Sequence, residues 1–240
     1  MRILFILLLL FQFNLVKANE INYLLKIPNL ETFDLNNING LKYLITKKNF
    51  RIGVQNNISC EKLDKRNLDN RFKLVKKNLN LYDENFLKKI NLRFVVLCEN
   101  LFISQINTAG IPDIEKRTLI LDLQFNEKYF ARVIHHEIFH LIQDSFPDLF
   151  DEKVWSKFNK KDFIYADCST CTDKLGLDIY NKTNGFLTEY SKTIPSEDMA
   201  EVYSFLITEK KNIDKIKKID PIIYNKVEFI ESKITKIKNY

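Results

Sequence analysis

The sequence is short of the residues that divide a chain into separate units, with only five Gly and five Pro among 240 residues. No internal repeat occurs, and no stretch rich in Pro, Gly and Ser interrupts it, so flexible joints between domains are not expected. Hydrophobic residues make up 45% of the chain, and charges of both signs are spread along it. This composition is typical of a folded globular protein with one sizeable core, and we expect a single domain over residues 19–240.

The sequence also lacks a basic stripe with interleaved aromatic residues, the pattern typical of nucleic-acid-binding proteins. Its formal net charge is +6, and Lys and Glu are interleaved through most of its length. The most basic stretch, residues 210–218, carries Ile213 and Ile216 at helical spacing, so we interpret it as a solvated helix face. We therefore expect no nucleic-acid partner.

Residues 1–18 have the three parts of a secretory signal peptide. Arg2 supplies the positive start, residues 3–11 form an unbroken apolar run, and Val16-Lys17-Ala18 offers a cleavage site. An uncleaved membrane anchor is the alternative, but this run is short against the roughly 20 residues of a membrane span. We expect a mature chain beginning near Asn19 that is secreted or periplasmic and not attached to a membrane.

Cysteine is scarce but even in number, with Cys60, Cys98, Cys168 and Cys171. Outside the cytosol such cysteines tend to pair, and the simplest of three connectivities joins Cys60 to Cys98 and Cys168 to Cys171. The Cys-x-x-Cys pair has two other interpretations, a redox pair or half of a zinc knuckle. It lies in a polar stretch rather than at the start of a helix, and no second Cys-x-x-Cys follows. We therefore expect structural disulfides.

Hydrophobic periodicity predicts strands followed by helices. Alternating or apolar runs predict strands at residues 50–58, 92–103 and 117–123, a turn at 109–112 and irregular structure at 21–44. Helical spacing predicts helices at residues 63–79, 127–143, 196–210 and from 221 onward. The helix at 127–143 is apolar on most sides, which marks it as central. Strands followed by helices indicate an α+β domain.

All three histidines of the sequence lie within six residues, at His135, His136 and His140. On a helix, His136 and His140 are one turn apart and point the same way, so both can bind one Zn²⁺. Glu137 lies about 100° round the helix, close enough to take a proton from a zinc-activated water without being a ligand. A chance match is the alternative, but a buried His-Glu-His cluster without partners would be costly. His135 points elsewhere, and we expect it to be partly exposed or hydrogen-bonded.

No histidine remains to complete the site. A catalytic zinc normally has three protein ligands and water, and Gln143 and Phe146 stand where the metzincin signature needs Gly and His. The third ligand is therefore a carboxylate or, less plausibly, a cysteine. Glu197 and Glu201 share one helix face, so one can bind the metal while the other accepts an N–H from a ligating histidine. A solvent-exposed acidic first turn is the alternative; it fits Asp198 well and Glu201 poorly.

The segment from Gly185 to Glu201 resembles the second motif of gluzincin metallopeptidases related to the anthrax lethal factor catalytic domain. It is also similar to bacterial zinc-binding metallopeptidases that share the pattern Tyr-x-x-Thr-x-x-x-Glu-Asp-x-Ala-Glu. The resemblance extends from about Leu92 to Leu206. It implies a zincin-like fold, in which a small mixed sheet packs on the central helix and a helical part follows.

This resemblance also implies roles for individual residues. Glu197 becomes the third zinc ligand, Glu201 the partner of a ligating histidine, and Tyr190 the phenol that stabilises the tetrahedral oxyanion. By analogy with zincin-like folds, the strand at 117–123 would be an edge strand that binds extended peptide. Two departures stand out: the separation of 57 positions between His140 and Glu197 makes a long insertion, and Phe139 in place of a small residue could narrow the cleft.

These observations predict a secreted zinc-dependent peptidase that hydrolyses peptide bonds through a zinc-activated water. Zn²⁺ is its expected cofactor, a peptide or protein its substrate, and a monomer its expected state. Two alternatives stay open. The first is a zinc-binding or adhesion protein that keeps the site without turnover, and the second is a secreted interaction module in which the motif is accidental.

Overall fold

A computed structural model describes residue 27 and residues 29–173 and 175–239 of the chain. The predicted signal peptide at residues 1–18 lies outside the described residues. Eight strands form one mixed sheet: β1 (Leu30–Asp34), β2 (Lys42–Thr46), β3 (Phe50–Ile52), β4 (Ile58–Glu61), β5 (Phe94–Ile103), β6 (Ile106–Asn107), β7 (Gly110–Asp113) and β8 (Thr118–Asp122). The helices are α2 (Leu68–Leu79), α3 (Glu84–Lys89), α4 (Glu127–Ser145), α5 (Glu152–Ser156), α6 (Pro195–Thr208), α7 (Lys210–Ile216) and α8 (Pro221–Asn239). In the described part of the chain, no helix is long and apolar enough to cross a membrane.

The long strand β5 organises the sheet. Its first half pairs in parallel with β2 on one side and β8 on the other, and β1 and β7 add antiparallel strands at the two edges. Its second half pairs with β4, which forms a hairpin with β3. The disulfide between Cys60 and Cys98 joins β4 to β5, as the sequence predicted.

Both faces of the sheet are covered by apolar side chains. From β5, Val95 and Leu97 point into the larger core, which lies between the sheet and the helices. Phe94 and Val96 point into a smaller core on the opposite face. Because its side chains are buried on both faces of the sheet, the sequence of β5 is a nearly continuous run of apolar residues.

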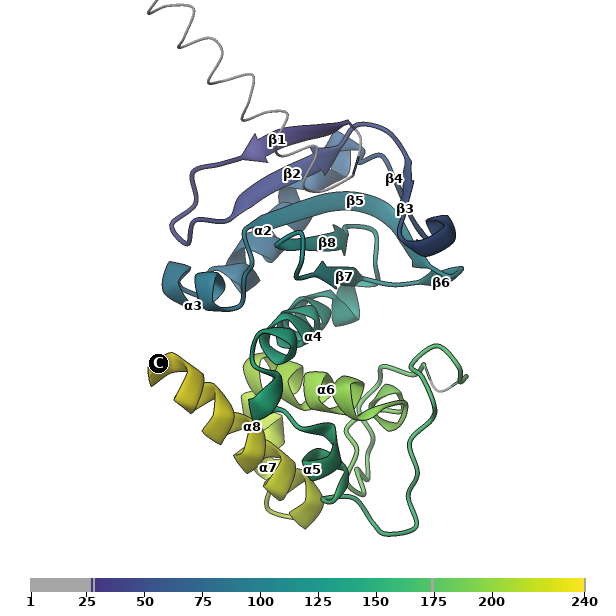
Figure 1. The fold of residues 1–240 in the computed structure, drawn as a ribbon, viewed down its shortest axis with the longest axis vertical. Coiled ribbons are helices and arrows are strands. Elements are labelled where there is room, and N and C mark those ends of the chain that lie inside the picture. Colours follow the sequence, from purple (N-terminus) through teal and green to yellow (C-terminus); the bar gives the residue numbers. More distant parts are fainter. Residues whose placement is uncertain (1–26, 28, 174, 240) are drawn as a thin grey trace, which may run out of the picture.

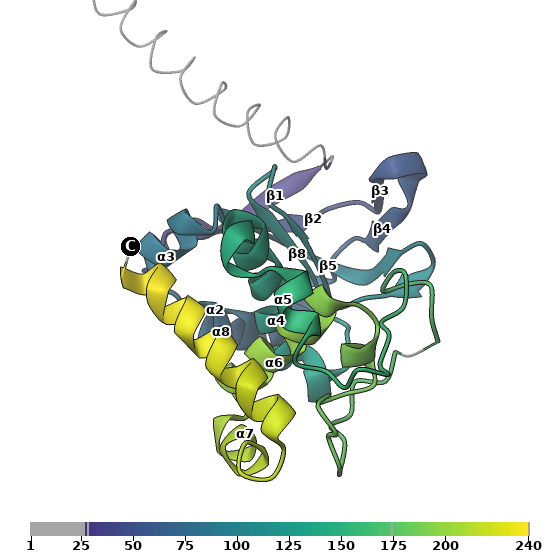
Figure 2. The same ribbon diagram turned by 60° about the horizontal axis from the view of Figure 1, so that its bottom comes forward.

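Helices α4 to α8 lie below the sheet in Figure 1, and α2 packs against α4 from the level of the sheet. Helix α4 packs between the sheet and α6, and α6 in turn contacts α5, α7 and α8. Figure 2 shows α8 running along the outside of this group. The mixed sheet and the helical carboxyl-terminal part agree with the predicted α+β class.

The predicted strand at 92–103 and helices at 63–79, 127–143 and from 221 onward are present with shifts of a few residues at their ends. The helix predicted at 196–210 is also present as α6, which ends at Thr208, and α7 follows as a separate helix. The strand predicted at 50–58 was wrong: it is the hairpin of β3 and β4, because the chain turns at Gly53, whose φ is 82°.

The amino-terminal and edge regions also differ from the sequence prediction. Residues 21–44, predicted to be irregular, contain β1 and the start of β2 in their described part. Residues 109–112, predicted to be a turn, form most of β7, and Pro112 is tolerated there because β7 is an edge strand. The strand predicted at 117–123 is therefore internal, since β8 lies between β5 and β7.

Candidate metal centre

Two histidines of α4 face α6 from successive turns. The ring centroids of His136 and His140 lie 4.9 Å apart, and their Nε2 atoms are 3.2 Å apart. His136 is buried and His140 is half-buried. Asn126 caps the start of α4 by accepting a hydrogen bond from the backbone N–H of Lys128. The helix thus presents both imidazoles on one side, as the spacing predicted.

Glu197 completes a compact set of three possible ligands. Its Oε2 atom lies 2.8 Å from Nε2 of His136 and 3.2 Å from Nε2 of His140. In a tetrahedral zinc site with ligand distances of roughly 2.0–2.1 Å, neighbouring ligand atoms are about 3.3 Å apart. The separations found here are close to that value, so two imidazole nitrogens and one carboxylate oxygen fit a zinc ion.

Glu201 lies one turn further along α6 and holds the other side of the His136 ring. Its Oε1 atom is 3.1 Å from Nδ1 of His136, and its Oε2 accepts a hydrogen bond of 2.8 Å from the Thr188 hydroxyl. Ser191 lies 3.0 Å from the Thr188 hydroxyl. This chain of hydrogen bonds fixes the imidazole with Nε2 turned toward Glu197. Thr188 was not predicted as a site residue, because no regular spacing connects it to the motif.

The electrostatics of the site favour a positive charge at His136. Burial alone would lower the pKa of His136, but hydrogen bonds to Glu197 and Glu201 outweigh it and raise the pKa to about 10. Burial would raise the pKa of Glu197, but His140 and His136 hold it well below its usual value. The two carboxylates that stabilise a positive charge on His136 would also stabilise a divalent cation bound beside it.

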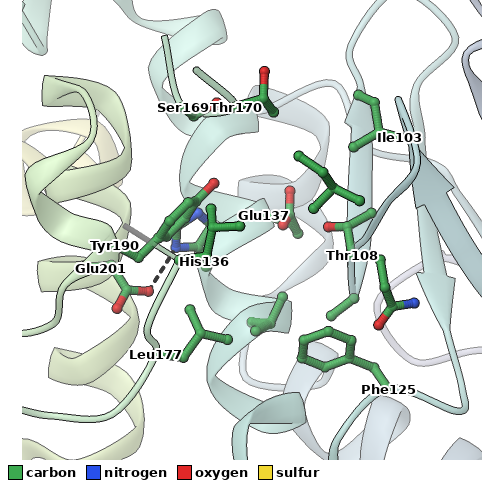
Figure 3. A pocket seen from close by; sticks show the side chains of 15 residues that line it. Ile103, Thr108, Phe125, His136, Glu137, Ser169, Thr170, Leu177, Tyr190 and Glu201 are labelled. Carbon is green, nitrogen blue, oxygen red and sulfur yellow. Dashed lines mark hydrogen bonds and ion pairs between the residues drawn. The ribbon is translucent and has the colours of Figure 1, made fainter. Parts of the chain in front are cut away.

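Glu137 points into a pocket between Tyr190 and Thr108 (Figure 3). Burial raises the pKa of its carboxyl to about 7, and the positive charges of His136 and His140 oppose only part of that rise. The edge strand β7 comes very close to this side chain. A Cβ atom at Gly110 would lie only 2.6 Å from Cγ of Glu137, so only glycine leaves room for it. The sequence did not reveal Gly110 as part of the site.

Tyr190 borders the same pocket from the opposite side. Its ring centroid lies 5.8 Å from that of His136, and the side chain is half-buried. Burial raises the pKa of its phenol well above the usual value, and the carboxylates of Glu197 and Glu137 raise it further. The phenol therefore stays protonated and able to donate a hydrogen bond at any physiological pH.

His135 belongs to a separate network on the far side of α4. Its Nε2 lies 2.9 Å from Oδ1 of Asn78, and its Nδ1 lies 2.6 Å from the Tyr82 hydroxyl. Tyr203 in turn donates to Tyr82. The hydrogen-bonded role predicted for His135 is confirmed, but the side chain is fully buried rather than partly exposed.

The expectation for Asp198 was wrong. It is not a solvent-exposed residue of the first helical turn but a fully buried carboxylate. Lys226 of α8, also fully buried, donates to its Oδ2 over 2.6 Å, and Trp155 and Tyr165 donate to the same atom over 2.8 and 2.6 Å. The helix dipole is not needed to explain this residue, because Lys226, Trp155 and Tyr165 all donate to one of its carboxylate oxygens.

The expected effect of Phe139 on the cleft was also wrong. Its side chain is fully buried and packs against the rings of Phe150 and Tyr203, at centroid distances of 5.1 and 5.4 Å. It lines neither cavity beside the candidate centre. A large residue is accommodated there because this side of α4 faces the core.

Two cavities of different character flank the candidate centre. One contains His136 and Glu137, and its walls are mainly apolar. The other is a wider groove that contains His140 and Glu197 together with acidic residues, which are Asp144, Asp148, Asp151 and Glu152. The two cavities share no lining residue: the first borders His136, and the second borders His140 and Glu197.

The fold and donor set together define an α+β protein with a candidate site for a divalent metal. Residues 105–240 match the family model described as "Putative zinc-binding metallo-peptidase". This match covers more than half of the chain and every residue of the candidate centre, and the chain belongs to that family. No curated protein matches it.

Proposed function

We propose that this protein is a secreted zinc-dependent peptidase of the gluzincin type, built on a zincin-like fold. The observation that carries the proposal is the convergence of His136, His140 and Glu197 on one point, with Glu137 beside them. His136, His140 and Glu197 would hold the ion. When bound, zinc would polarise the carbonyl of a peptide bond and lower the pKa of a water molecule.

Glu137 is the proposed general base. It takes the proton from the attacking water and passes it to the amine that leaves, so it must alternate between its two protonation states. In the metal-free protein, burial raises the pKa of this carboxyl to about 7, which brings it closer to the range in which a general base is effective. The close approach of Gly110 limits where the carboxylate can go and keeps it in the pocket.

Tyr190 is the proposed donor to the oxyanion that forms on the substrate carbonyl. Its phenol stays protonated, and it stands beside His136 and borders the pocket that holds Glu137. A fixed O–H directed at developing negative charge stabilises it without reorganisation. Glu201 acts through His136, whose ring it orients with the help of Thr188.

The substrate would be an extended peptide or protein segment. Strand β7 is an edge of the sheet beside α4, and it pairs only with β8 among the described strands. An extended chain can add to such an edge by main-chain hydrogen bonds. A chain bound in this way would bring its scissile bond near Glu137, since Gly110 of β7 lies close to that residue.

We further propose that the mature chain is secreted or periplasmic and acts as a monomer. The two disulfides, Cys60–Cys98 and Cys168–Cys171, support an oxidising compartment. The signal peptide predicted at residues 1–18 supports the same location.

The decisive variant is Glu137→Gln in purified mature protein. We expect wild type to carry about one zinc and to cleave members of a degenerate peptide library. Glu137→Gln should keep its zinc and lose at least about a hundredfold in rate, since general base catalysis contributes that much. Zinc without cleavage in wild type would favour the non-catalytic binding protein. Absence of zinc would favour the interaction module in which the motif is accidental.

A further inference from the structure

The apolar cavity beside Glu137 has a volume of about 210 Å³. Helix α4 supplies its floor and β5 to β7 with their connections supply one side. Seven apolar side chains line it, namely Ile103, Ile106, Ala109, Phe125, Val133, Leu175 and Leu177. Figure 3 shows Phe125 and Leu177 at one end and Ser169 and Thr170 at the other.

The chemistry of the lining selects against charged groups. No Lys or Arg is among the lining residues, and the two carboxylates present, Glu137 and Glu201, already have other roles. An acidic side chain would meet both of these carboxylates, and a cationic one would lose its water against apolar walls. Burying an apolar side chain is favourable in such a place.

The outer wall of the cavity is formed by the insertion between His140 and Glu197. Ser169 and Thr170 are the two residues enclosed by the Cys168–Cys171 disulfide, which closes a tight loop over the cavity. Leu175 and Leu177 continue the same wall. Leu175 is 39% exposed, so its side chain forms part of the rim rather than the protein core.

This wall is fastened to the catalytic helix and to Tyr190. Arg132 of α4 donates to the carbonyl of Leu177 over 2.5 Å, and the Tyr129 hydroxyl donates to Asp178 over 3.1 Å. The backbone N–H of Tyr190 donates to the carbonyl of Gly176 over 3.0 Å. The wall therefore has a defined position relative to the groups that would act on the substrate.

We propose that this cavity is a specificity pocket that takes an apolar side chain of the substrate next to the scissile bond, and that the loop closed by Cys168–Cys171 is its outer wall. The inference rests on the proposed peptidase function. It gives the long insertion between His140 and Glu197 a role in substrate selection. The Cys60–Cys98 disulfide differs, because it is buried in the sheet and lines neither cavity.

A binding experiment tests the pocket separately from catalysis. The probes are two peptide hydroxamates that differ only in a leucine or an aspartate side chain next to the hydroxamate, titrated into zinc-loaded protein by calorimetry. We expect the leucine probe to bind at least tenfold more tightly to wild type. Leu175→Lys should reduce that ratio to about threefold or less, whereas Ile164→Lys, a change at an 85% exposed position of the same insertion, should leave it unchanged.

The disulfide is tested by the double variant Cys168→Ser with Cys171→Ser. Both cysteines lie at or near the surface, so circular dichroism and thermal unfolding should show a folded protein. The leucine preference should fall at least threefold, and in parallel the cleavage library should show a weaker preference for apolar residues at one position beside the cleaved bond.

The outcomes separate the two proposals. Leucine preference in binding without hydrolysis would remove the peptidase and leave the pocket standing. Equal binding of the two hydroxamates to wild type would overturn the pocket, even if peptides are cleaved. Full leucine preference in the double cysteine variant would overturn the role of the disulfide loop as the wall.

Discussion

Neighbouring residues on the two central helices have opposite surroundings. On α4, His135 lies in a closed network with Tyr82 and Asn78, whereas His136 faces the candidate metal centre. On α6, Asp198 is neutralised by Lys226, whereas Glu197 faces the same centre as His136. About 100° of helical rotation separates the members of each pair.

The comparison separates polar groups that hold the fold from polar groups that are available for chemistry. The network of His135 is complete within the protein, because each ring nitrogen has a partner and a neutral ring satisfies both. The cluster at His136, His140 and Glu197 instead brings two imidazole nitrogens and a carboxylate oxygen within 4.8 Å of one another, as a metal site requires. Substitutions on the two sides should therefore affect different measurements.

The largest effect is expected at the buried ion pair. Asp198→Asn leaves the Lys226 ammonium buried without a counter-charge, which should cost about 3–5 kcal/mol in free energy of unfolding. Urea denaturation of metal-free protein measures this cost. The double variant Asp198→Asn with Lys226→Met is the control and should recover part of the loss. A cost below about 1 kcal/mol for the single variant would show that this side of α6 does not hold the fold.

On the opposite side of α6, substitutions should change metal binding more than stability. Glu197→Ala removes a ligand and should weaken zinc binding by more than a hundredfold, whereas Glu201→Ala should weaken it by about 10–100-fold. Competition with a chromogenic chelator gives both affinities. If Glu201→Ala has the larger effect, the ligand and the residue that orients His136 have been exchanged.

The pH dependence of stability sharpens the comparison on α4. Burial lowers the pKa of His135 to about 4 in the folded protein, against about 6.5 in an unfolded chain. Between these values the unfolded chain binds more protons, so acidification favours unfolding. From pH 7 to pH 5 the contribution of His135 should fall by about 2 kcal/mol.

The measurement is urea denaturation of metal-free wild type and His135→Gln at both pH values. The difference between their pH dependences isolates His135 from the other titrating groups, including His136. Identical pH dependences in the two proteins would show that His135 is not held neutral by the fold.

A smaller effect is expected from Gly110→Ala at the edge strand. The added Cβ would lie 2.6 Å from Cγ of Glu137, so the proposed base must move. We expect kcat to fall by about tenfold, a barrier increase of about 1.4 kcal/mol, with zinc content unchanged. Unaltered kcat would mean that Glu137 tolerates displacement or does not act as the base.

The parts predicted from sequence are those with a strong local pattern. The His136–His140 spacing, the amphipathic helices and the continuous apolar run of β5 are all encoded within short windows. Both disulfides joined the cysteines that the simplest pairing suggested. Glu197 lies beside the two histidines, where the resemblance implied a zinc ligand, and its role as a ligand stays a prediction.

The parts missed depend on distant residues. Asp198 was read as exposed because its partner Lys226 lies 28 positions later on another helix. Residues 109–112 suggested a turn because Gly and Pro dominate short-range patterns, whereas pairing with β8 makes them a strand. The space that Gly110 leaves for Glu137 exists only once the sheet edge and α4 are packed together.

Zinc K-edge X-ray absorption on the zinc-loaded wild-type protein tests the ligand set itself. We expect scattering from two imidazole rings, with nitrogen and oxygen ligands at roughly 2.0–2.1 Å. Sulfur at about 2.3 Å, or fewer than two imidazoles, would contradict a centre formed by His136, His140 and Glu197.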